Sequence, residues 1–234
     1  MFPYKDDNPT ILTPVVTVGI IALNLAAWIF LQGAGAEGPL ARSVCELGLI
    51  PGEVLGTVPP GTAVPLGPGM HCVTTGAPHW WTVLTSMFMH GGWFHVLGNM
   101  WFLWVFGNNI EDSMGHGRFV VFYLVCGAAA AAAQALADSH SVVPMVGASG
   151  AISGVLGGYL LLYPRVRVHT LITLGFFITT VALPAYVILG YWFLLQLLMG
   201  TVGALSRAQG GVAFWAHVGG FVAGLGLTKH HAEG

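Results

Sequence analysis

The chain has 234 residues, of which only 7 are Lys or Arg and 9 are Asp or Glu, and its formal net charge at pH 7 is −2. Apolar residues make up 55% of it and the mean hydropathy is +0.76, whereas about a quarter of a typical soluble chain is charged. So few charges can neither cover a water-facing surface nor form a basic patch, which excludes a soluble enzyme, a disordered tail and a nucleic-acid-binding protein and favours an integral membrane protein.

Charge-free stretches show where the chain could cross a bilayer, because a helix of about 20 residues spans the hydrocarbon core. The longest stretch is interrupted between Thr57 and Pro78, where Pro and Gly cannot continue a helix. We therefore predict an all-α, polytopic membrane protein with six spanning helices, at 12–31, 93–110, 119–137, 144–163, 183–204 and 213–228. The transmembrane domain, 12–229, then includes a long outer loop at 32–80, and short cytoplasmic segments at 1–11 and 230–234 flank it.

Two of these stretches have alternative interpretations. The small residues at 34–36 would also fit a cleaved signal peptide, but the acidic residues at 6–7 and the spanning length of the apolar segment favour a membrane helix. The stretch 168–206 either crosses once after an interfacial lead-in or forms a helical hairpin broken at Pro184. A hairpin would insert the last helix from the opposite side of the membrane.

The cationic residues predict the orientation, because they are enriched in cytoplasmic loops. With a cytoplasmic N-terminus, five of them lie inside: Lys5, Arg118, Arg165, Arg167 and Lys229. Two lie outside: Arg42 and Arg207. We therefore expect both termini in the cytoplasm.

Two of the three cysteines, Cys45 and Cys72, fall in the predicted outer loop, where thiols can stay oxidised. A disulfide between them is predicted, although the sequence does not show whether their Cα atoms come within bridging distance. The third, Cys126, lies within a predicted span and is expected to be a packing residue.

The fourth predicted span opens with a serine among small residues, in the run Val146-Gly147-Ala148-Ser149-Gly150-Ala151. Polar side chains are costly inside a membrane and are therefore candidates for function, and the small neighbours would let a reactant reach the Ser149 hydroxyl. A structural role is the alternative, because Gly150, Gly154 and Gly158 form a stripe typical of close helix packing. Intramembrane serines also often bond to a backbone carbonyl.

The sixth predicted span contains one histidine, His217. Gly220 and Gly224 share its helical face, so this face could pack against the glycine stripe of the fourth span and bring His217 to Ser149 as a general base. A structural hydrogen bond is the alternative, as is a proton relay in a small transporter.

The depths of the two side chains can be compared. If their helices begin near Pro144 and Gly211 and enter from the outer side, Ser149 and His217 both lie roughly 8 to 9 Å along them. This agreement holds only if 168–206 crosses the membrane once.

The second predicted span supplies the pair His95 and Asn99, which are four residues apart and therefore lie on one helical face. Both side chains are hydrogen-bond donors without a permanent negative charge. A metal site including His90 is the alternative, but the spacing of five residues would place His90 and His95 on different faces, and no Cys, Asp or Glu accompanies them. We expect neither a metal nor a cofactor.

These motifs together resemble the rhomboid family of intramembrane serine proteases. They are His95-x-x-x-Asn99, Gly147-x-Ser149-Gly150 and Ala216-His217, in the second, fourth and sixth of six spans. Each is weak alone, but their order is specific, and the resemblance extends over nearly the whole chain. It implies a six-helix bundle in which Ser149 is the nucleophile and His217 the general base and acid.

The resemblance further implies that His95, Asn99 and the backbone N–H of Ser149 form an oxyanion hole, and that Glu111 and Arg118 organise a cytoplasmic loop. Since no Asp or Glu lies within the spans, we expect a Ser–His dyad in which packing orients the imidazole. The expected substrates are single-pass membrane proteins, cut in or near their transmembrane segment, in the plasma membrane of a prokaryote. A catalytically silent rhomboid-like protein that binds membrane proteins is the alternative.

Three positions depart from the family pattern. Ser153 stands where many relatives have a tyrosine that stacks on the catalytic imidazole. Gly98 replaces a bulky residue before the oxyanion asparagine, and a Trp-Arg pair of the outer loop is here Trp81-Thr82. These differences leave open what orients His217 and how substrates enter.

Overall fold

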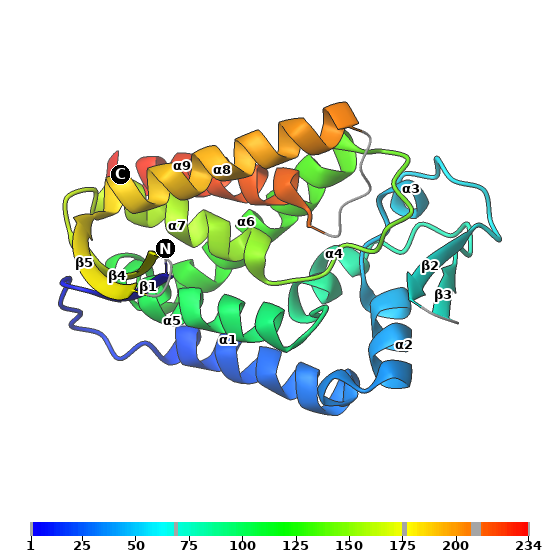
Figure 1. The fold of residues 1–234 in the computed structure, drawn as a ribbon, viewed down its shortest axis with the longest axis horizontal. Coiled ribbons are helices and arrows are strands. Elements are labelled where there is room, and N and C mark those ends of the chain that lie inside the picture. Colours follow the sequence, from blue (N-terminus) through cyan, green and yellow to red (C-terminus); the bar gives the residue numbers. More distant parts are fainter. Residues whose placement is uncertain (1, 68–69, 175–176, 207–211, 234) are drawn as a thin grey trace.

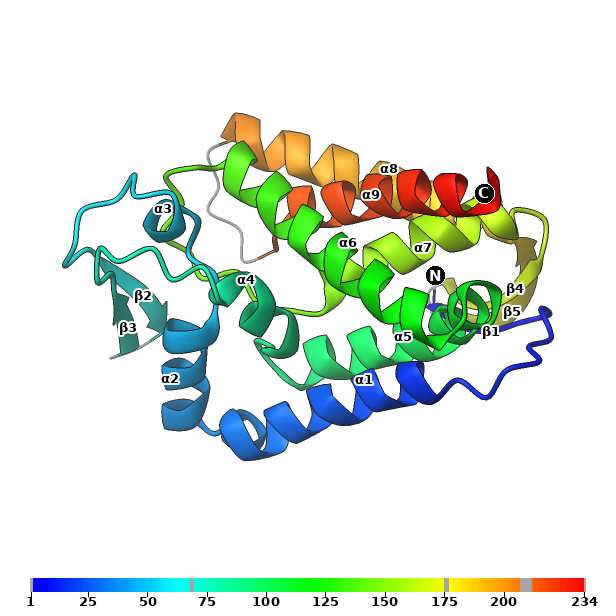
Figure 2. The same ribbon diagram turned by 180° about the vertical axis from the view of Figure 1, so that it is seen from behind.

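The computed structural model describes residues 2–67, 70–174, 177–206 and 212–233, and six of the helices in these ranges lie side by side in one bundle (Figure 1 and Figure 2). They are α1 (Val15–Ala26), α5 (Trp93–Met114), α6 (His116–Ala137), α7 (Ser149–Leu162), α8 (Ala185–Ser206) and α9 (Phe214–Glu233). A π-helical turn, Ala27–Leu31, extends α1. Each helix falls on one of the predicted spans, so the predicted helix positions are confirmed and their bounds shift by a few residues.

By length and composition, fewer than six of these helices qualify as membrane spans. In the described ranges, two helices are long and apolar enough to span a bilayer, His116–Ala137 and Ala185–Ala204. The apolar segments Val15–Leu31 and Ser149–Leu162 are shorter. The six membrane crossings therefore stay a prediction.

The central helix α7 packs directly against α9. Residues 150–159 of α7 are all buried. A Cβ atom on Gly220 would overlap the carbonyl group of Gly150, and one on Gly224 would overlap the backbone of Gly154. Because these residues are glycines, the two backbones can approach within contact distance. The prediction that the glycine-lined faces of these two helices pack together is confirmed, and this contact is called the glycine seam below.

Small antiparallel sheets accompany the helices, and in this respect the all-α prediction is wrong. β1 (Phe2–Asp6), β4 (Arg167–Leu174) and β5 (Phe177–Pro184) form one sheet in the order β1-β4-β5. Residues 167–184, which include β4 and β5, are rich in Val, Ile, Thr and Phe, and these residue types favour strands. The β4–β5 hairpin thus fills the first part of the stretch 168–206, and α8 follows it as one helix, so the helical-hairpin interpretation is wrong. The fold is predominantly helical.

The segment predicted as a long outer loop has structure of its own. It contains η2 (Gly33–Gly35), α2 (Glu37–Leu47), α3 (Pro51–Val54) and the hairpin β2 (Ala63–Gly67) and β3 (Met70–Val73). Cys45 on α2 and Cys72 on β3 are joined by a disulfide with Cα atoms 5.3 Å apart, which fastens the hairpin to α2. Cys126 is buried on α6 against Gly154. The short helices α4 (Thr82–Thr85) and η3 (Ser86–Phe88) then lead toward α5.

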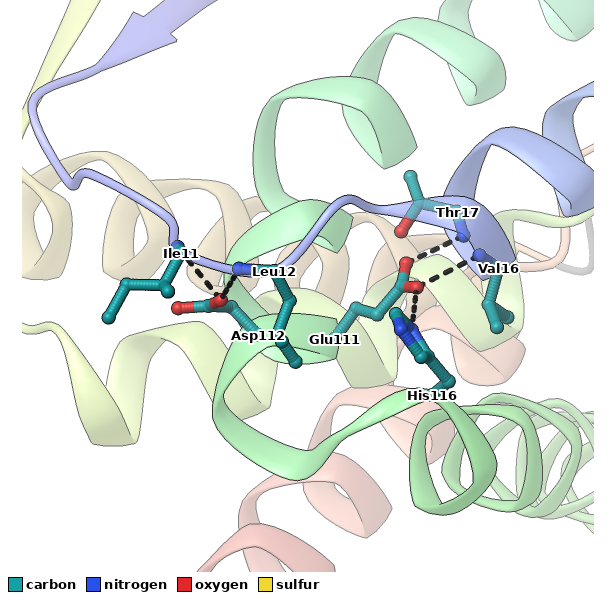
Figure 3. A network of polar contacts seen from close by, with 7 residues as sticks. All are labelled: Ile11, Leu12, Val16, Thr17, Glu111, Asp112 and His116. Atoms are coloured by element: carbon teal, nitrogen blue, oxygen red, sulfur yellow. Dashed lines mark hydrogen bonds and ion pairs between the residues drawn. The ribbon is translucent and has the colours of Figure 1, made fainter.

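The start of α1 is held by a carboxylate from another helix, as Figure 3 shows. Pro14 precedes α1, and no side chain there caps it. Glu111, near the end of α5, accepts hydrogen bonds from the backbone N–H groups of Val16 and Thr17 at 2.9 and 2.8 Å. One of its oxygens also lies 2.6 Å from His116 Nδ1. Glu111 therefore supplies the acceptor that the first turn of α1 lacks.

These contacts determine the charge state of Glu111. Burial raises the pKa of its carboxyl, but the hydrogen bonds from Thr17, Val16 and His116 outweigh burial and hold the pKa below its usual value of 4.5. A carboxyl with a lowered pKa stabilises the fold above the pKa of the unfolded chain. This stabilisation is lost as the pH falls through the lower pKa of the folded state.

We expect the Glu111→Gln variant to be less stable than the parent by about 2 kcal/mol at pH 7, because two helix N–H groups lose a charged acceptor. Below pH ~4.5 the difference should shrink as the parent carboxylate is protonated. Unfolding of the detergent-solubilised proteins at both pH values measures this. Asp112→Asn is the control, because Asp112 accepts N–H bonds from Ile11 and Leu12 at an exposed position and should matter less. Equal stability of the Glu111→Gln variant and the parent at pH 7 would contradict the assignment.

Candidate active site

Ser149 is the first residue of α7, at the end of a sharply turned connection. Met145 pairs with Leu49 in an isolated β-bridge, and the N–H of Gly147 donates to the carbonyl of Ser86 at 2.9 Å. The φ of Gly147 is +130°, which side-chain-bearing residues rarely adopt. The predicted helix start at Pro144 is therefore wrong, and the Ser149 N–H lies in the first turn, where no helical carbonyl pairs with it.

His217 lies in the first turn of α9, across the glycine seam from Ser149. Its Nε2 is 2.8 Å from Ser149 Oγ, within hydrogen-bond distance. The seam explains this contact, because the glycines bring the two helix backbones together just beyond these side chains. The predicted start of this helix at Gly211, like Arg207, lies outside the described residues.

The other ring nitrogen of His217 also has a polar partner. Nδ1 lies 2.8 Å from Oε1 of Gln196 on α8. The ring of Trp192, one turn before Gln196, lies 5.9 Å from the imidazole, centroid to centroid, at an interplanar angle of 37°. The expected packing contact is thus accompanied by a polar contact that the sequence analysis does not predict. The sequence holds a signal for Gln196, since it is a strongly polar residue in an apolar helix.

Ser153 does not take the place of a stacking aromatic residue. Its hydroxyl donates to the backbone carbonyl of Ser149 at 2.6 Å, a bond that serine commonly makes inside helices. The Ser153 side chain thus reinforces the first turn of α7.

His95 and Asn99 lie on α5 and face the same cavity as Ser149. The backbone N–H of Gly91 donates to His95 Nδ1 at 3.2 Å, so the neutral ring carries its proton on Nε2. A Cβ on Gly147 would lie only 2.8 Å from this Nε2, which places the His95 N–H beside the turn before Ser149. Asn99 is 8% exposed, and its Nδ2 has no partner among the described residues. Both groups can therefore donate into the cavity.

His90 lies beside this site rather than away from it. Its ring is fully buried and lies 5.1 Å from the His95 ring, centroid to centroid. The prediction of separate faces is wrong because His90 precedes α5, which begins at Trp93. Burial and, secondly, His95 lower the pKa of His90 to about 3, so His90 is neutral at pH 7. No cluster of three or more potential metal ligands occurs within the described ranges.

The four candidate side chains share one cavity inside the bundle, with a volume of about 540 Å³. Ser149, His217, His95 and Asn99 all line it, together with mainly apolar residues of α5, α6, α7 and α9. A hydroxyl paired with an imidazole thus faces a space that also contains two further hydrogen-bond donors. Such an arrangement suits nucleophilic attack on a carbonyl group.

The fold and this cavity define a predominantly helical, apolar protein whose interior holds a hydrogen-bonded serine and histidine. Residues 77–231 match the Rhomboid domain, and the chain belongs to the rhomboid family. Members of this family are generally intramembrane serine proteases.

Several curated proteins are similar to the chain. Rhomboid protease GluP of Bacillus subtilis (strain 168) is 33% identical over 157 residues, which cover 66% of this chain and 28% of that protein. Putative rhomboid protease YdcA of the same organism is 28% identical over 152 residues, 64% of this chain and 62% of that protein. RHOMBOID-like protein 5 of Arabidopsis thaliana is 34% identical over 80 residues, 34% of this chain and 26% of that protein. The chain thus spans less than two thirds of each relative's length.

Proposed function

We propose that the chain is an intramembrane serine endopeptidase that hydrolyses peptide bonds in or near the transmembrane segments of membrane proteins. The observation that carries this proposal is the 2.8 Å contact between Ser149 Oγ and His217 Nε2 at a cavity inside an apolar bundle. A serine hydroxyl is a weak nucleophile until a neighbouring base removes its proton. His217 is placed to act as that base.

The chemistry follows from the two side chains. Ser149 Oγ attacks the carbonyl carbon of the scissile bond while its proton passes to His217 Nε2. The imidazolium then gives this proton to the leaving amine nitrogen as the C–N bond breaks, which leaves an acyl ester on Ser149. Water, deprotonated by His217, attacks the ester and releases the carboxylic acid, and the proton returns to Ser149 Oγ.

Three donors would stabilise the oxyanion of each tetrahedral intermediate. The Nε2–H of His95, the Nδ2 of Asn99 and the backbone N–H of Ser149 all lie at or beside the cavity. Donors held in place before the reaction are effective in a site of low dielectric, since they need no reorganisation as the charge develops. The unpaired Asn99 Nδ2 supports this role because a buried donor without a partner costs free energy.

The location of the site suggests the substrate. A peptide must be extended to enter a cavity between helices, so we propose single-pass membrane proteins whose transmembrane segment unwinds near its outer end. The six helices would cross the plasma membrane with both termini in the cytoplasm. Family membership and relatives named as rhomboid proteases support this assignment.

Covalent labelling of the purified protein in detergent tests the nucleophile. We expect a fluorophosphonate probe to label the parent at Ser149 and the Ser149→Ala variant not at all, because an activated serine oxygen displaces fluoride from the probe and forms a phosphonate ester. In-gel fluorescence and mass spectrometry of the labelled peptide measure this.

Ser153→Ala is the matched control. It removes a hydroxyl from the same helix and the same cavity lining, but this hydroxyl is bonded to a backbone carbonyl, so labelling should persist. Labelling that survives Ser149→Ala would remove the nucleophile assignment. A parent that is not labelled and does not cleave a model transmembrane substrate would instead favour the silent membrane-protein binder.

A further inference from the structure

We propose that Gln196 is a positioning residue for His217, so that the site is a Ser149–His217–Gln196 triad rather than a dyad. This inference rests on the proposed protease function and adds a third member to its site. The observation that carries it is the 2.8 Å contact between Gln196 Oε1 and His217 Nδ1, on the side of the ring opposite Ser149.

The contact selects one form of the imidazole. A neutral imidazole carries one N–H, and an amide oxygen can only accept a hydrogen bond. With Gln196 Oε1 at Nδ1, the proton lies on Nδ1 and the lone pair lies on Nε2. That lone pair faces Ser149 Oγ, which is the form that a general base requires.

The imidazole is held by α8 in two ways. Gln196 accepts its N–H, and Trp192, four residues earlier on the same helical face, packs against the ring. The family pattern places an orienting aromatic residue one turn after the nucleophile, where this chain has Ser153. In this chain the Ser153 hydroxyl bonds to the Ser149 carbonyl instead, and the polar and aromatic contacts of the His217 ring come from α8.

A neutral hydrogen-bond partner for His217, such as the Gln196 amide, also suits the apolar bundle around it. Burying a carboxylate in an apolar bundle carries a large desolvation cost, whereas an amide costs less and still offers an acceptor dipole to the imidazolium formed during catalysis. Among the described residues that line the cavity, His95 is the other titratable side chain. It is present in every variant below, so changes among them report on position 196.

The test compares Gln196→Leu and Gln196→Glu with the parent on a model transmembrane substrate. Leucine removes the acceptor, and we expect kcat to fall on the order of 10- to 100-fold with little change in KM. This is less than the ~10⁴-fold effect of altering the charged orienting residue of a serine-protease triad, because an amide stabilises the imidazolium less. The rate of fluorophosphonate labelling at Ser149 should fall by a similar factor.

Glutamate keeps an acceptor at the same reach, so the Gln196→Glu variant should recover part of the lost rate. Its negative charge favours the imidazolium, so the acidic limb of its pH–rate profile should move to higher pH. A purely structural role for Gln196 would produce neither the rescue nor this displacement. Thr201→Val is the matched control, because it removes another polar group from α8 that bonds to a backbone carbonyl and should leave kcat unchanged.

The outcomes separate this inference from the proposed function. Parent protein that is labelled at Ser149, together with a Gln196→Leu variant that has the parent's kcat and pH–rate profile, would overturn the triad and leave the protease intact. Parent protein that is not labelled would overturn the protease itself. Should Gln196→Leu fail to fold, Gln196→Met decides, because methionine has a similar length and no amide oxygen, and the parent's kcat in that variant would also overturn the triad.

Discussion

Replacing His217 by alanine is expected to lower kcat for cleavage of a model transmembrane substrate on the order of 10⁴-fold or more. Among the described residues, His217 Nε2 is the proposed base and lies within hydrogen-bond distance of Ser149 Oγ, so its removal takes away the expected acceptor of the serine proton. The loss of one member of a serine-protease triad costs up to ~10⁶-fold in kcat, because the members act as a unit. Initial rates for purified parent and variant proteins in the same detergent measure the effect.

The double variant sharpens this prediction. If Ser149 and His217 act in one step, Ser149→Ala combined with His217→Ala should be no slower than Ser149→Ala alone. His230→Ala is the control, because His230 lies on the same helix outside the cavity and should keep the parent rate. A His217→Ala variant that retains more than about a tenth of the parent kcat would show that another group takes the proton.

The glycine seam should tolerate no added methyl group. We expect Gly224→Ala to destabilise the fold by about 1 to 3 kcal/mol or more, which is the typical effect of overpacking a core. The new Cβ would overlap the carbonyl group and Cα of Gly154, which are backbone atoms and cannot turn away as a side chain could. Activity should fall as well, since separating α7 from α9 lengthens the contact between Ser149 and His217. Thermal unfolding and cleavage assays measure the two effects.

Gly226→Ala is the matched control for this substitution. Gly226 lies two residues further along α9, and a Cβ there would meet no atom of the described residues within 4 Å. Glycine inside a helix is less favourable than alanine by about 0.5–1 kcal/mol, so this variant should be as stable as the parent or slightly more stable. If both variants behave alike, close contact between α7 and α9 does not hold the bundle together.

Much of the fold could be predicted from local features of the sequence. The charge-free stretches gave the positions of the six helices, since an apolar helix is recognisable without knowledge of its neighbours. The glycine spacing on α7 and α9 predicted their close packing. The strands β4 and β5 were missed because apolar residues there match a buried helix as well as a strand, and their third partner, β1, lies far away in the chain.

The candidate site was predicted in part. Ser149, His217, His95 and Asn99 stand out because polar groups are rare in apolar segments, and the structure brings all four to one cavity. Their catalytic roles stay a prediction until the variants are measured. The sequence placed the helix of Ser149 too early, because the β-bridge at Met145 and the unusual φ of Gly147 depend on other segments.

The sequence by itself determined the candidates for nucleophile, base and oxyanion donors, and the approximate positions of the helices that carry them. Only the tertiary structure decided what surrounds them: Gln196 at the second nitrogen of His217, and Glu111 at the start of α1. The physical reason is the range of the interactions. Composition and periodicity act over one helix and can be read along the chain, whereas a hydrogen bond between two helices depends on their relative rotation and depth, which packing alone determines.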